Sequence, residues 1–159
     1  MSLADRLDAE PSGVARDVVR GRKADVLADI HCPGTGAAIW ARSPDAGFQN
    51  WIDALPIRCL PEMNTVVPVE TAKVAVLSAC EAAGLPDGSM RDVLAGDVAA
   101  LALIAGRLLE VSEVRIRLDV ACDVMCPKFH IDAVSARLLC TYRGPGTQYV
   151  PEGLEDVPR

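Results

Sequence analysis

The residues best suited to chemistry gather near the C-terminal end of the chain. Cys122, Cys126, His130 and Asp132 bring two thiols, an imidazole and a carboxylate within eleven residues. Each of these groups can donate an electron pair to a divalent metal. The spacing Cys-x3-Cys-x3-His-x-Asp therefore predicts a metal site.

His130 and Asp132 carry the geometric part of this prediction. Residues two apart on a strand project to the same side, which would place the imidazole beside the carboxylate. Cys122 and Cys126 share the same even numbering. Pro127 interrupts an unbroken central strand, so the argument applies to each piece of the segment separately.

Zinc and iron are the two metals that this donor set suggests. Sulfur beside nitrogen and oxygen donors favours Zn²⁺ over Mg²⁺ or Ca²⁺. His-x-Asp on a strand also begins the two-His-one-carboxylate site of non-haem Fe(II) oxygenases of the 2-oxoglutarate type. That site needs a second His downstream, and the only other one, His31, lies far upstream. Zinc is therefore favoured, and an incomplete oxygenase-like enzyme is the alternative.

A metal-free interpretation also stays open. Cys122 and Cys126 could be small buried hydrophobic residues, as free cysteines often are. Asp132 could be a turn or cap carboxylate, and His31 with Cys32 fits a turn. The motif would then be a conformational anchor in an interaction domain.

Four residues beyond the motif are candidates for binding a substrate or an anion. Arg137 could hold an anion through two parallel hydrogen bonds, or pair with an acidic neighbour. Thr141 and Tyr142 could bind a water or substrate, although strands favour both residue types. The Gly144-Pro145-Gly146 bend before Thr147 could offer backbone N–H groups to an anion.

Over these residues the sequence resembles the bacterial domain-of-unknown-function family 1826. The resemblance extends to the Trp40-Ala41-Arg42 and Trp51 region and to the helical middle of the chain. It is carried by Cys126-Pro127-x-Phe129-His130-x-Asp132 and Arg137-Leu138-Leu139-x-Thr141-Tyr142-x-Gly144-Pro145-Gly146-Thr147.

The resemblance implies a protein whose genes lie near those of zinc homeostasis and of metal-transfer GTPases. It favours a role in metal homeostasis, with such a GTPase or a small-molecule ligand as partner. Family members continue beyond the Gly-Pro-Gly-Thr turn into further strands with another His, whereas 27 residues follow Asp132 here. We therefore expect a short or truncated member, and whether it is an enzyme stays open.

Composition and charge narrow the class of protein. Half of the 159 residues are apolar and 24% are charged, as in a globular domain with a core. The 16 basic and 22 acidic residues give a net charge of −6, and no run of Lys and Arg interrupts that balance. Because a phosphate backbone would be repelled, we expect no nucleic-acid partner.

The location is predicted from apolar runs and cysteines. Charges are scattered through the first ten residues, unlike in a signal peptide. The longest apolar run, residues 98–105, is far shorter than the roughly 20 residues that cross a bilayer. We expect a cytoplasmic protein without membrane contact, whose six cysteines are thiols or ligands.

Hydrophobic periodicity predicts the elements that would position the motif. Helices are expected over residues 14–30, 45–55, 69–84 and 90–111, and a turn at 31–36. Strands are expected over residues 37–41, 57–60, 114–120 and 134–143, with an irregular connection at 61–68.

This order predicts an α+β fold, with N-terminal helices and short strands packed on a C-terminal antiparallel sheet. That sheet could form a partial double-stranded β-helix of the jelly-roll kind. Residues 13–151 are expected to form a single globular domain between a flexible start, 1–12, and a flexible acidic tail, 152–159. A homodimer is left open, since an unpaired sheet edge invites pairing.

Overall fold

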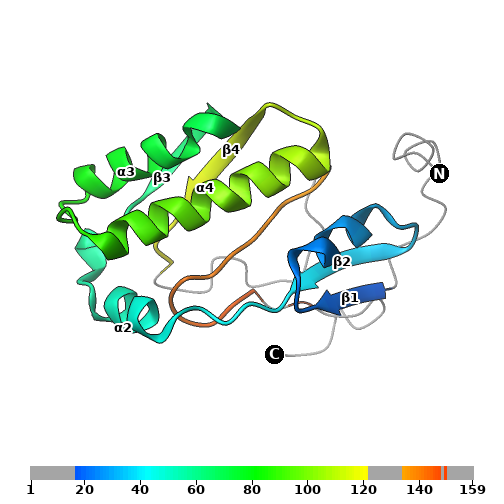
Figure 1. The fold of residues 1–159 in the computed structure, drawn as a ribbon, viewed down its shortest axis with the longest axis horizontal. Coiled ribbons are helices and arrows are strands. Elements are labelled where there is room, and N and C mark those ends of the chain that lie inside the picture. Colours follow the sequence, from blue (N-terminus) through cyan, green and yellow to red (C-terminus); the bar gives the residue numbers. More distant parts are fainter. Residues whose placement is uncertain (1–16, 122–133, 148, 150–159) are drawn as a thin grey trace. The chain divides into compact units, whose positions relative to one another are not determined.

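The computed structural model describes residues 17–121, 134–147 and 149. Helices, short strands and an antiparallel strand pair confirm the α+β prediction (Figure 1). The jelly-roll arrangement is not confirmed, because the described strands form two separate two-stranded sheets. The elements in chain order are β1 (Asp17–Gly21), η1 (Ala24–His31), β2 (Thr35–Trp40), α2 (Ala46–Ala54), η2 (Ile57–Cys59), β3 (Met63–Pro68), η3 (Val69–Thr71), α3 (Ala72–Ala82), α4 (Ser89–Leu109) and β4 (Glu113–Leu118).

The described residues divide into two compact units. The first holds residues 17–43, and the second holds residues 44–121 and 134–147. The ends that we predicted to be flexible, residues 1–12 and 152–159, lie outside the described residues. None of the described helices is both long and apolar enough to cross a bilayer.

The first unit is built on a parallel strand pair, β1 beside β2. The helical prediction over residues 14–30 is wrong for residues 17–21, which form a strand, whereas residues 24–31 form a helix of the 3₁₀ type. Neighbouring β-branched residues Val18 and Val19 favour the strand. Gly21 lets η1 fold back closely, since a Cβ there would lie 2.9 Å from the Cβ of Val26.

The turn predicted between η1 and β2 is confirmed. The Thr35 N–H donates to the Cys32 carbonyl at 3.1 Å. Gly34 has a φ of 85°. Pro followed by a glycine with positive φ is typical of a type II turn. The predicted strand over residues 37–41 corresponds to β2.

Helix α2 begins where the sequence predicts, after Asp45. The Asp45 carboxylate accepts hydrogen bonds from the backbone N–H groups of Gly47 at 2.9 Å and Phe48 at 3.1 Å. This is an N-cap, which satisfies donors that the first turn leaves without partners. The cap and the buried residues Phe48 and Ile52 together fix the helix.

The second unit contains an antiparallel strand pair, β3 with β4. The predicted strand near residues 114–120 is confirmed as β4. The irregular connection predicted over residues 61–68 is wrong, because β3 runs from Met63 to Pro68 opposite Leu118 to Glu113. Pro68 ends the strand rather than breaking it. The strand predicted at 57–60 is instead the single 3₁₀ turn η2.

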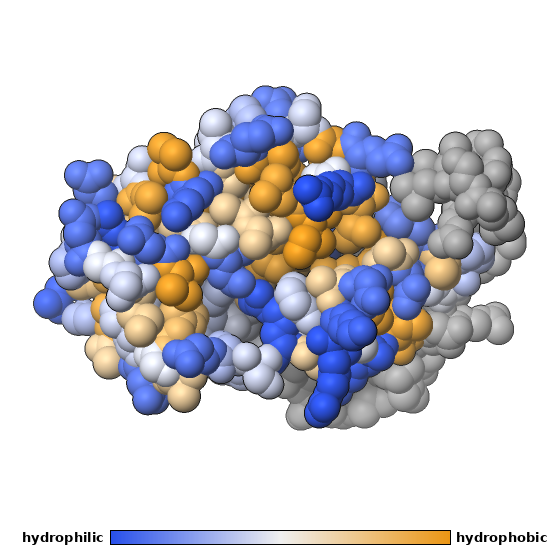
Figure 2. Space-filling model, in the orientation of Figure 1, coloured by the Kyte–Doolittle hydropathy of each residue, from blue (hydrophilic) through white to orange (hydrophobic). Residues whose placement is uncertain are grey.

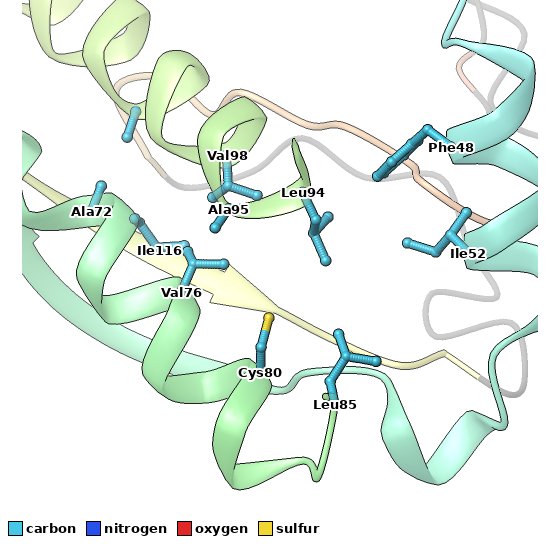
Figure 3. Packing of buried hydrophobic residues seen from close by; sticks show 11 residues of the cluster. Phe48, Ile52, Ala72, Val76, Cys80, Leu85, Leu94, Ala95, Val98 and Ile116 are labelled. Atoms are coloured by element: carbon cyan, nitrogen blue, oxygen red, sulfur yellow. The ribbon is translucent and has the colours of Figure 1, made fainter. Parts of the chain in front are cut away.

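Helices α3 and α4, both predicted, pack together and against β3 and β4 (Figure 1). Figure 3 shows Val76 and Cys80 of α3 projecting toward Ala95 and Val98 of α4. The fully buried Val76 and Cys80 mark the centre of this core. The core cluster consists of Phe48, Ile52, Ala72, Val76, Cys80, Leu85, Leu94, Ala95, Val98, Ala102 and Ile116.

Candidate functional site

The four predicted metal ligands, Cys122, Cys126, His130 and Asp132, lie outside the described residues. Within residues 17–121, 134–147 and 149, no three or more His, Cys, Asp and Glu residues are grouped so that they could hold a metal ion. The metal prediction thus depends on the sequence alone.

Residues 134–147, which follow the motif, are described and form no strand. The strand predicted over residues 134–143 is therefore wrong. The alternation of apolar and polar residues that predicted this strand reflects, at Tyr142, burial against helices. Tyr142 is directed toward helices of the second unit, whereas Thr141 and Arg143 on either side are exposed.

Tyr142 attaches this segment to two helices. Its Oη donates to Oδ2 of Asp97 in α4 at 2.7 Å. Its ring meets the Phe48 ring of α2 edge-on, with centroids 6.1 Å apart. Its carbonyl accepts from Nε2 of Gln49, also in α2, at 3.1 Å. The residue predicted to bind a substrate is therefore half-buried and contributes to the structure of the unit.

Arg143 adds a second attachment. Its Nη1 donates to the Leu55 carbonyl at 2.7 Å, at the C-terminal end of α2. A cation is favoured there by the helix dipole and by carbonyls without intrahelical partners. Tyr142 and Arg143 together attach residues 134–147 to α2 and α4.

The other three candidates for substrate or anion binding, Arg137, Thr141 and Thr147, are exposed. Their proposed roles stay predictions. Sequence reasoning did not single out Asp97, Gln49 or Arg143. Asp97 offered a signal, since it is a lone carboxylate within the Ala- and Leu-rich stretch of α4.

Residues 21–157 match the model of a protein family of unknown function, DUF1826. The chain belongs to this family. The resemblance recognised in the sequence is thus confirmed. No curated protein and no solved structure matches this DUF1826 chain. Membership assigns no reaction.

A shallow hollow of about 190 Å³ lies at the N-terminal end of α4. Its apolar wall includes Trp51, Leu55 and Leu85. At its rim, Arg91 pairs with Asp87 and donates to the Leu85 carbonyl at 3.3 Å. Ligand pockets usually measure about 300–1,000 Å³, so this hollow is too small to suggest a ligand.

Cys80 is a core residue and not a nucleophile. Burial raises the pKa of its thiol above the ordinary value of 9.0, and the charge of Arg91 offsets only part of that effect. A thiol kept neutral and enclosed reacts poorly. Cys32 and Cys59 are half-buried, and Cys140 is the exposed cysteine among those described.

Proposed function

We propose that this DUF1826 protein binds a divalent metal, zinc in preference to iron, and serves in zinc storage, delivery or sensing. The ligands are Cys126, His130 and Asp132, with Cys122 as the fourth. The observation that carries the proposal is the donor set itself. Two thiols, an imidazole and a carboxylate within eleven residues have the composition and number that tetrahedral zinc requires.

The described neighbours of the motif support this assignment. On its N-terminal side, β4 ends at Leu118 and is paired with β3. On its C-terminal side, Tyr142 is attached to α2 and α4. Both flanks belong to the second unit. Because the flanks are already ordered, less conformational entropy is lost when a metal gathers the ligands between them.

A zinc competition titration against a chromophoric chelator tests the ligands one by one. His130→Ala, Asp132→Asn and Cys126→Ser should each weaken zinc binding more than about 100-fold, since even the outer-shell partners of ligands contribute 10–100-fold. Cys122→Ser should weaken zinc binding to a similar extent if Cys122 is the fourth ligand.

Matched controls remove the same chemical groups elsewhere in the chain. His31→Ala removes the other imidazole, and Cys140→Ser removes an exposed thiol. Both variants should bind zinc as the unmodified protein does. If His130→Ala binds zinc as tightly as His31→Ala, the assignment is wrong.

The same variants separate the oxygenase alternative. Under this alternative, protein loaded anaerobically with Fe(II) and then supplied with O₂ would consume 2-oxoglutarate in a manner that depends on His130 and Asp132. Such turnover, with weak zinc binding, would replace the storage and delivery proposal. Delivery would in addition require a partner such as a metal-transfer GTPase.

A further inference from the structure

The parallel pairing in the first unit brings basic residues together that are far apart in sequence. Arg20, Arg22 and Lys23 lie at and just after the end of β1, and Arg42 follows the end of β2. Gly21 is opposite Trp40, and the Ala41 N–H donates to the Gly21 carbonyl at 2.8 Å. Because the strands are parallel, their C-terminal ends meet. We call these four cations the basic end.

Local charge at the basic end differs from that of the whole chain. Residues 18–24 contain three cations and no carboxylate, and residues 36–44 contain one cation and no carboxylate. Asp25, in the first turn of η1, is the nearest acidic residue in the sequence. These two segments therefore concentrate positive charge within a chain whose net charge is −6.

Three of these cations are exposed, and nothing in the described chain neutralises them. Arg20, Arg22 and Lys23 are exposed, and no described residue forms an ion pair with them. Figure 2 shows strongly hydrophilic side chains over the β1–β2 pair. Exposed guanidinium groups retain their forked sets of N–H donors for an anion.

Trp40 contacts both Arg22 and Arg42 of the basic end. Its Nε1 donates to the Arg22 carbonyl at 3.1 Å, which holds the chain after β1 against β2. The Arg42 guanidinium lies over the Trp40 ring, 5.1 Å from its centroid. This stacking limits the conformations of Arg42 and leaves that ring face unavailable to a nucleobase.

We propose that the basic end binds a small anion that carries at least two phosphate groups. Adjacent strands lie about 4.8 Å apart, and each residue advances about 3.3 Å along a strand. The Cα atoms of the four basic residues therefore lie within roughly 10–12 Å of one another. That span suits several charges on one small molecule. Arginine matches phosphate oxygens in paired hydrogen bonds. The excess of acid elsewhere disfavours a long polyanion.

Calorimetric titration of the full chain with inorganic triphosphate tests this site. The protein should bind the probe, and affinity should fall as salt concentration rises. Arg20→Gln/Arg22→Gln should raise the Kd at least tenfold. Arg58→Gln/Arg107→Gln, which also removes two exposed arginines, should leave the Kd unchanged. Triphosphate also binds metal ions, and the heat of that reaction should be the same in the unmodified protein and in both double variants.

Four results would overturn the proposal. They are no binding up to millimolar triphosphate, equal weakening in both double variants, equal affinity for citrate, or unchanged affinity in Arg20→Gln/Arg22→Gln. Circular dichroism of each variant checks that the fold is retained. None of the four cations is a proposed metal ligand, so His130→Ala should bind triphosphate as the unmodified protein does even if zinc binding fails.

Discussion

At the scale of single residues, Tyr142 has structural contacts that its place in the motif did not predict, while its role in substrate binding stays a prediction. Its hydroxyl, ring and carbonyl each have a partner, and those partners come from two helices. A side chain held in this way stabilises the segment of residues 134–147 against α2 and α4.

Tyr142→Phe should lower the free energy of unfolding by about 1–3 kcal/mol, because Asp97 loses a hydrogen-bond donor. Urea denaturation measures this change. Tyr149→Phe is the matched control, since Tyr149 is 51% exposed, and should change stability by less than about 0.5 kcal/mol. Equal effects at both tyrosines would show that the Tyr142–Asp97 hydrogen bond contributes nothing.

Cys80 makes a pH-dependent contribution to stability. Its pKa is raised in the folded protein, so the folded state holds the thiol proton more tightly than the unfolded chain. That contribution is complete below the ordinary thiol pKa and is lost as pH rises through the raised value. The stability advantage of the unmodified protein over Cys80→Ala should therefore shrink between about pH 8 and about pH 10.5.

Urea denaturation at both pH values, under reducing conditions, measures that advantage. Cys140→Ala, at an exposed position, is the matched control for removing a thiol. An advantage over Cys80→Ala that is constant or grows with pH would contradict the assignment.

Residue-level prediction succeeded where the interaction is local in sequence. The Asp45 cap and the Pro33-Gly34 turn involve partners within three residues. The contact of Gln49 with Tyr142 spans 93 residues and that of Arg143 with Leu55 spans 88. Side-chain type alone cannot identify such partners, because they are set by tertiary packing.

At the scale of elements, the helices that bury one face and strands β2 and β4 were predictable, whereas strands β1 and β3 were not. Helices α2, α3 and α4 carry apolar residues with helical spacing over two turns or more. Strands β1 and β3 have five and six residues and are bounded by glycine or proline. Runs that short fit several structures, so partner strands decide between them.

Two glycines of α4 give opposite predictions for the same substitution. A Cβ at Gly106 would lie 2.8 Å from Cγ1 of Val69 and 3.0 Å from the Val111 carbonyl oxygen, whereas nothing lies within 4 Å of one at Gly96. Gly106→Ala should destabilise the protein by about 1–3 kcal/mol through this clash. Gly96→Ala should stabilise it by about 0.5–1 kcal/mol, since alanine loses less entropy in a helix.

Thermal or urea unfolding of the two variants measures both effects, and each variant is the control for the other. If Gly106→Ala stabilises the protein as Gly96→Ala does, the close approach of α4 to Val69 is not as described.

At the scale of the whole molecule, the net charge of the chain concealed the cluster of basic residues that we call the basic end. The net charge of −6 argued against a nucleic-acid partner, although residues 17–43 contain four basic and three acidic residues. Parallel pairing of β1 with β2 collects Arg42 with cations some 20 residues earlier. No sequence window reveals that pairing, because it depends on which strands meet.

The metal centre is the central claim of this account, and the metal content of the protein tests it most directly. The full chain, purified without added metal and analysed for bound elements, should contain one zinc per chain. His130→Ala purified in parallel should contain none, while His31→Ala should match the unmodified protein. Zinc-free protein that also fails to take up zinc when it is supplied would contradict the claim.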